Sequence, residues 1–143
     1  MISQISSSSR ILKPFFKAEE IIVEEMDEEF EDAQDWITDI IENRDRPKLN
    51  HCEICHSSEK LEQHHIRGRK HGNETITVCY KCHSILTNKQ RLWDRSWLDP
   101  NTENKDIFLN RGIIDVCELK YQKTGKKIYG KYAQILTEGF TYD

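Results

Sequence analysis

The sequence predicts a small, mostly helical α+β protein with two short strands near the middle of the chain. Apolar residues recur at helical spacing before residue 45 and again after residue 105. Between these segments, the β-branched run Thr75–Val78 predicts a strand. Two CxxC pairs bracket this region, and a hydrophobic content of only 36% implies a modest core. A structural metal would supply folding energy that such a core lacks.

Length and composition limit the class of protein. A chain of 143 residues suits one domain, or a small domain with arms. No apolar run approaches the about 18 residues that a membrane-spanning helix needs. The serine-rich segment 1–10 lacks the apolar stretch of a secretion signal. We therefore expect a cytoplasmic protein without a membrane partner, in which paired cysteines hold metal rather than form disulfides.

Charge is distributed unevenly along the chain. Residues 1–47 carry 5 Lys or Arg against 13 Asp or Glu, whereas residues 48–143 carry 16 against 12. The net charge of −4 is therefore the sum of an acidic N-terminal segment, residues 1–47, and a basic remainder, residues 48–143. Because local charge governs contact with nucleic acid, the overall acidity does not exclude that partner.

Residues 1–47 are expected to form a disordered start followed by an acidic amphipathic helix over residues 18–44, which ends before Pro47. One apolar stripe on this helix comprises Met26, Phe30, Ala33, Ile37 and Ile40. The stripe either packs on the chain's own body or pairs with its copy in a homodimer. A third alternative makes the acidic helix an autoinhibitory lid over the basic part.

Residues 48–98 contain the two CxxC pairs. Their four thiolates match a tetrahedral structural zinc site, with the ligands Cys52, Cys55, Cys79 and Cys82. The 23 residues between the two pairs are slightly more than the usual spacing of a zinc ribbon. The alternative is two buried thiol pairs without metal. Strands are predicted over residues 61–66 and 75–78, with a turn-rich loop between them. A helix is predicted over residues 83–97.

Residues 99–143 are expected to form a helical extension. Apolar residues at helical spacing predict a helix over residues 106–121, with Ile107, Phe108, Ile113, Ile114 and Cys117 on its buried side. Cys117 has no CxxC partner and is expected to be a small buried apolar residue. A basic turn over residues 123–127 precedes a last helix over residues 128–137.

Several residues outside the cysteines complete a known pattern. The stretch His64-His65-Ile66, then Asn73, then Cys79-Tyr80-Lys81-Cys82-His83 resembles the HNH endonuclease family. The resemblance covers roughly residues 50–90. It implies a ββα-metal (His-Me finger) core, stapled by zinc and flanked by helices, and an enzyme that hydrolyses DNA phosphodiester bonds.

The resemblance also implies roles for individual residues. His65 would be the general base, His64 and His83 would bind a catalytic divalent cation, and Asn73 would orient His65. Histidine at position 64 favours zinc, nickel or manganese over magnesium. Neighbours on a regular strand point to opposite faces, so the strand must twist or end at His64 and His65.

Basic residues near this pattern fit a DNA partner, expected to be double-stranded. They lie in the inter-strand loop and along the second CxxC pair and helix: Arg67, Arg69, Lys70, Lys81, Lys89 and Arg91. Such residues neutralise phosphates without reading bases. The remaining histidines, His51, His56 and His71, are expected to be solvated.

Two other functions fit parts of the sequence. A zinc-dependent nucleic-acid-binding module without catalysis would need the same cysteines and basic residues. Both CxxC pairs are also followed by histidine, at His56 and His83, and CxxCH is the attachment motif of c-type haem. A di-haem cytochrome is disfavoured because haem is attached outside the cytosol and the chain shows no signal segment.

Overall fold

The computed structural model describes residues 27–43, 45–69, 72–93 and 106–139. Its elements, in chain order, are α2 (Asp27–Glu42), β1 (Leu61–His65), β2 (Thr75–Cys79), α3 (Tyr80–Arg91), α4 (Asp106–Thr124) and α5 (Lys127–Gly139). The predicted α+β, mostly helical class is confirmed. The predictions for residues 1–26, Lys70, His71 and the end of the 83–97 helix lie outside the described residues.

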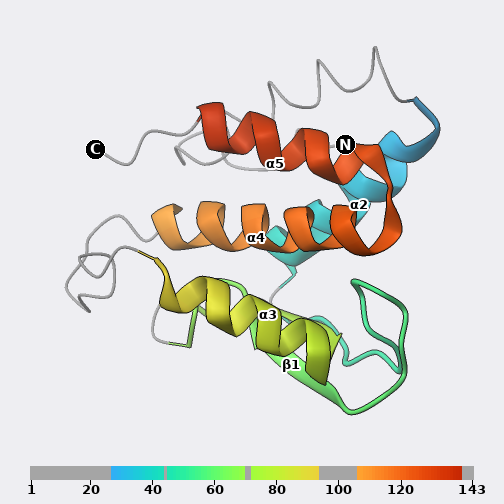
Figure 1. The fold of residues 1–143 in the computed structure, drawn as a ribbon, viewed down its shortest axis with the longest axis vertical. Helices are drawn as coiled ribbons and strands as arrows, with labels where there is room; N and C mark the ends of the chain where they lie inside the picture. Colours follow the sequence, from blue (N-terminus) through green and yellow to red (C-terminus); the bar gives the residue numbers. More distant parts are fainter. Residues whose placement is uncertain (1–26, 44, 70–71, 94–105, 140–143) are drawn as a thin grey trace.

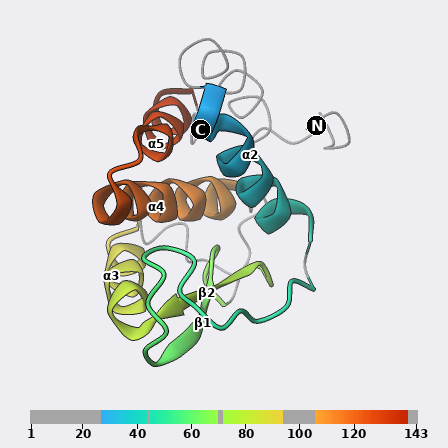
Figure 2. The same ribbon diagram turned by 90° about the vertical axis from the view of Figure 1, so that its right-hand side faces the viewer.

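Helix α4 lies at the centre of the molecule. Figure 1 shows α5, α4 and α3 stacked in that order, with β1 behind α3. Turned by 90°, the molecule shows α2 running along the side of α4 and α5 (Figure 2). Among the described residues, no helix is both long and apolar enough to cross a bilayer.

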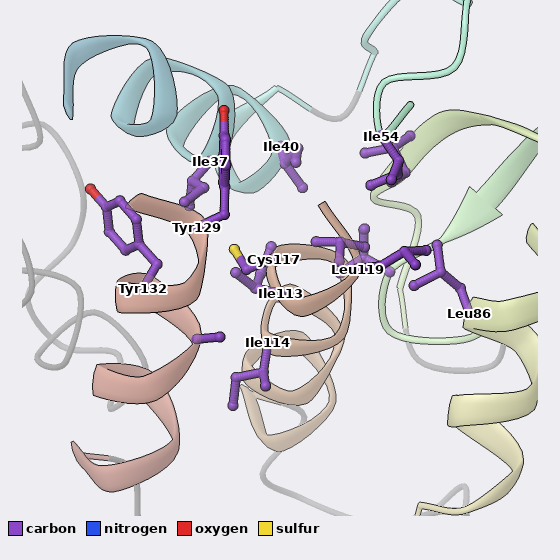
Figure 3. Packing of buried hydrophobic residues seen from close by; sticks show 14 of the residues in the cluster. Ile37, Ile40, Ile54, Leu86, Ile113, Ile114, Cys117, Leu119, Tyr129 and Tyr132 are labelled. Atoms are coloured by element: carbon purple, nitrogen blue, oxygen red, sulfur yellow. The ribbon is translucent and has the colours of Figure 1, made fainter. Parts of the chain in front are cut away.

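The central position of α4 explains its sequence. The predicted apolar side is buried, and so are residues on the other sides, such as Leu109, Val116 and Leu119. Most of α4 is buried on all sides because α3 covers it on one side and α5 on another. Cys117 is fully buried as predicted and lies beside Ile113 in the core (Figure 3).

The apolar stripe of α2 packs within the same chain. Phe30, Ala33, Ile37 and Ile40 are all buried and belong to the one core cluster that also contains α4 and α5 residues. This agrees with the first of the two alternatives for the stripe. Segments from all three predicted regions of the chain therefore share a single hydrophobic core.

The two strands form an antiparallel hairpin. Leu61 pairs with Cys79 and His65 pairs with Thr75. Both strands lie within one residue of their predicted ends. Helix α3 begins at Tyr80, three residues before the predicted start, because Cys79 keeps an extended backbone (φ −73°, ψ 164°) and the chain turns into the helix at once. Cys82 and His83 consequently lie in the first turn of α3.

A buried carboxylate joins the first CxxC segment to α2 and β2. Glu53 accepts hydrogen bonds from the Arg46 guanidinium, from Trp36 Nε1 at 3.0 Å and from the backbone N–H of Thr77. Both Arg46 and Glu53 are shielded from solvent. A buried charge is stable only when it is paired and hydrogen-bonded, so these contacts must form together.

The same segment is tied to α4 by a buried lysine. Lys120 Nζ donates to the backbone carbonyl of Glu53 at 2.6 Å. The ammonium also lies 4.0 Å from the ring centroid of Trp36 and 5.1 Å from that of Tyr129. Aromatic faces attract a cation, which offsets part of the cost of burying it. The first CxxC segment is thereby joined to α2, α4 and α5.

Helix α4 also touches the backbone that follows β1. A Cβ atom added at Gly112 would clash with the carbonyl oxygen of Ile66. Ile66 directly follows His65 at the end of β1 and is fully buried. Only glycine allows the helix to approach this closely, so α4 fixes the position of the histidine-bearing end of β1.

We expect Arg46→Ala to lower the free energy of unfolding by about 3–5 kcal/mol, because it leaves the Glu53 carboxylate buried without its cation. Urea denaturation measures the change. The control is Arg91→Ala, since Arg91 is exposed on α3 and its removal should cost less than about 0.5 kcal/mol. Equal effects of the two substitutions would contradict the central role of the buried pair.

Gly112→Ala should lower the free energy of unfolding by about 1–3 kcal/mol, because backbone atoms of Ile66 must move away. The matched control is Gly130→Ala in α5. There the added Cβ meets the Tyr121 ring at 3.0 Å, and that side chain is half exposed and free to shift. Thermal melts of both variants test the expectation, which fails if Gly112→Ala melts at or above the wild-type temperature.

Candidate functional site

The four cysteines of the CxxC pairs form one cluster. Cys52, Cys55, Cys79 and Cys82 place their sulfur atoms within 4.8 Å of one another. Tetrahedral zinc with Zn–S bonds of about 2.3 Å would separate its sulfurs by about 3.8 Å. The Cys55 and Cys79 sulfurs are 3.7 Å apart, which fits this geometry. The cluster could therefore hold a metal ion such as zinc.

The local backbone supports the cluster. The N–H groups of Ile54 and Cys55 both point at Cys52 Sγ, at 3.4 Å each. Backbone donors of this kind stabilise a thiolate. Burial, followed by the neighbouring sulfurs, raises the pKa of Cys82 above its usual range. A bound cation would remove that penalty and allow all four thiols to ionise.

His64 and His83 are brought together between β1 and α3. Their ring centroids are 5.6 Å apart and the rings meet nearly edge to face. His64 is only 2% exposed. Burial, followed by the charges of His83 and His65, lowers the pKa of His64 to about 3. Its imidazole is therefore neutral at physiological pH, the state in which histidine binds metal.

Two further side chains contact these histidines. Glu62 Oε1 lies 3.1 Å from His83 Nδ1. Gln90 Nε2 donates to the backbone carbonyl of His65 at 2.8 Å and lies 3.4 Å from His64 Nε2. Sequence reasoning missed both residues. A usable signal existed, because Glu62 is two residues before His64 on a strand, which places both side chains on one face.

His65 lies apart from this pair. It is the last residue of β1, is partly exposed, and its side chain makes no hydrogen bond or ring contact with His64 or His83 in the part of the chain that the structure describes. Burial, followed by the charges of Arg69 and His83, lowers the pKa of His65. The strand ends here, since Gly68 N–H bonds back to the His65 carbonyl at 3.0 Å.

The loop between the strands is closed by an ion pair. Arg67 donates to both carboxylate oxygens of Glu74 at 3.0 Å each, and both side chains are largely buried. The guanidinium of Arg67 is therefore engaged within the loop. Asn73 is exposed and makes no hydrogen bond to another described residue, so the structure shows no contact through which it would orient His65.

The other basic residues lie on the surface to different degrees. Arg69, Lys81 and Arg91 are exposed. Lys81 lies beside Tyr80, whose ring also faces Lys60 Nζ at 5.1 Å. Lys89 is paired with Glu118 of α4 at 3.5 Å. Arg69, Lys81 and Arg91 thus remain exposed along α3 and the loop, Lys89 is engaged by Glu118, and Lys70 lies outside the described residues.

The geometry bears on the haem alternative. His56 is exposed and stacks on His51 with ring centroids 5.5 Å apart, so it is not enclosed as an axial haem ligand would be. Both CxxC pairs converge on one compact sulfur cluster. Two haems, each bonded to its own pair, would need the pairs to lie apart.

No protein-family model matches the chain, and no curated protein or solved structure matches it. The features that indicate a function are therefore the four-cysteine cluster and the His64–His83 pair.

We expect Cys79→Ser to abolish binding of the first equivalent of zinc and to unfold the segment between the CxxC pairs, because zinc binding contributes roughly 10–16 kcal/mol in such sites. Elemental analysis and a thermal melt measure both effects. Cys117→Ala is the control, since this buried cysteine lies outside the cluster. Retention of zinc with an unchanged melting temperature in Cys79→Ser would contradict a structural metal.

Proposed function

We propose that the chain is a metal-dependent endonuclease of the HNH type, which hydrolyses phosphodiester bonds of DNA on a ββα-metal core. The observation that carries the proposal is the meeting of His64 and His83 between β1 and α3, beside the four-cysteine cluster. A hairpin followed directly by a helix brings together residues that are 19 positions apart in the sequence.

The paired histidines suit a catalytic divalent cation. His64 is neutral, and the edge-to-face arrangement at 5.6 Å allows one ion to be reached by both rings. Two protein ligands leave positions for water and a phosphate oxygen. When bound, the cation would stabilise the developing charge and the leaving oxygen of the phosphodiester. Imidazole ligands favour manganese, nickel or zinc, with magnesium as a further candidate.

His65 is the proposed general base. A partly exposed imidazole at a strand end can accept a proton from water and release it to solvent. Its lowered pKa keeps it neutral at physiological pH, which is the form that a base needs. In this proposal His65 activates the attacking water, while the cation held by His64 and His83 acts on the leaving oxygen.

The exposed basic residues supply the DNA contact. Arg69 in the loop and Lys81 and Arg91 at the two ends of α3 flank the histidines. Charges in this arrangement bind phosphates along a backbone rather than reading base edges. The partner that fits is therefore a nucleic-acid backbone, and we propose duplex DNA.

A non-catalytic zinc-dependent nucleic-acid-binding module is the second candidate. Burial of His64 and the Gln90 amide beside its Nε2 favour it, because both restrict access of an ion.

Plasmid DNA incubated with the protein and Mg²⁺, Mn²⁺, Ni²⁺ or Zn²⁺ separates the two functions. If the protein binds DNA but does not cleave it with any of these ions, the non-catalytic binding module is supported and the nuclease proposal is wrong.

We expect His65→Ala to bind metal and DNA as the wild type does but to cleave about 10²–10⁴-fold more slowly, the usual cost of losing a general base. Wild-type cleavage should rise with pH to a plateau, with the midpoint of the rise below pH 6.5, since the pKa of His65 is lowered from that value. His56→Ala is the control, because this exposed histidine lies away from the pair. If His65→Ala cleaves DNA at the wild-type rate, His65 is not the general base.

A further inference from the structure

The contact between Glu62 and His83 has a geometry that stability alone does not explain. The carboxylate lies 3.1 Å from Nδ1, yet the Glu62 side chain is 49% exposed and that of His83 is 25% exposed. Ion pairs in such solvent-exposed positions contribute little to folding. Glu62 also lies on the same strand face as His64, so it borders the histidine pair.

The chemistry of the two groups fixes the position of a proton. An ionised carboxylate only accepts hydrogen bonds, and a neutral imidazole has one donor nitrogen and one acceptor nitrogen. Nδ1 of His83 must therefore carry the hydrogen in this contact. In the neutral ring the lone pair is then on Nε2, at the end of the ring away from Glu62. Carboxylates orient metal-binding histidines in this way in many metal sites.

We propose that Glu62 is a positioning residue, which holds His83 in the tautomer and orientation that present Nε2 to a divalent cation shared with His64. This inference rests on the proposed nuclease function and adds to it a residue that the family resemblance did not assign. Glu62 is not itself a ligand in this arrangement, because Glu62, His64 and His83 do not form a compact three-ligand group among the described residues.

The test uses the full-length, zinc-loaded protein and two readouts. Nitrogen-15 NMR of the histidine rings reports which nitrogen of His83 carries hydrogen. Titration with Mn²⁺, followed by the paramagnetic resonance of the free ion, reports affinity for the second metal. Mn²⁺ is suitable because it has little affinity for a four-thiolate site.

The wild type should show hydrogen on Nδ1 of His83, and Glu62→Ala should lose this preference and bind Mn²⁺ about 10–100-fold more weakly. Glu62→Gln keeps an accepting oxygen and should lose less than Glu62→Ala. Glu59→Gln is the matched control, since Glu59 is an exposed acid in the bend before β1. All variants should keep zinc and melt near the wild-type temperature, because Glu62 is half exposed.

The outcomes separate this inference from the function on which it rests. If the wild type binds Mn²⁺ and cleaves DNA while Glu62→Ala does both equally well, the role of Glu62 is wrong and the nuclease stands. Hydrogen on Nε2 of His83 in the wild type would overturn the role in the same way. If the wild type binds no second ion and cleaves nothing, the proposed function fails and the role of Glu62 falls with it.

Discussion

The arrangement of α2, β2 and α4 around the first CxxC pair depends on one buried residue, Glu53. Glu53 lies between two cysteines of the four-cysteine cluster, and its side chain is held by Arg46 and Trp36 from the α2 side. Its backbone carbonyl is held by Lys120 from α4. Because a buried anion cannot lose these partners singly without a large penalty, helices and hairpin are fixed together. The cluster is therefore an integral part of the core rather than a separate knuckle.

The sequence predicted elements better than it predicted their partners. Both strands lie within one residue of expectation, because β-branched residues and cysteines mark their ends. The predicted start of α3 is three residues late, because Cys79 ends the strand and Cys82 is already helical. Lys120 and Glu53 are 67 residues apart, and a contact between residues so distant in the sequence cannot be predicted from local sequence patterns.

For the candidate site, proximity was predicted in part. The fold gathers all four cysteines, as the CxxC spacing indicated, and brings His64 to His83, two residues that the family resemblance had linked. The family resemblance assigns His64 and His65 to one site, although neighbouring residues on a strand point to opposite faces. Both residues lie on β1, and this alternation separates their side chains. Arg67 was expected to face DNA, but Glu74 occupies its guanidinium, because a buried carboxylate in the loop needs a partner. Local charge counts do not reveal such pairing.

The contacts of Glu53 have a second effect at the margin of the two-stranded sheet. The outer side of β2 would present unpaired backbone groups to any passing strand. Instead, the Thr77 N–H bonds to the Glu53 carboxylate, the Thr77 carbonyl accepts from the Glu53 backbone, and the Thr75 carbonyl accepts from Arg46. One acidic residue and one basic residue thus complete the sheet as a third strand would. The network that supports the core also guards this margin against edge-to-edge aggregation.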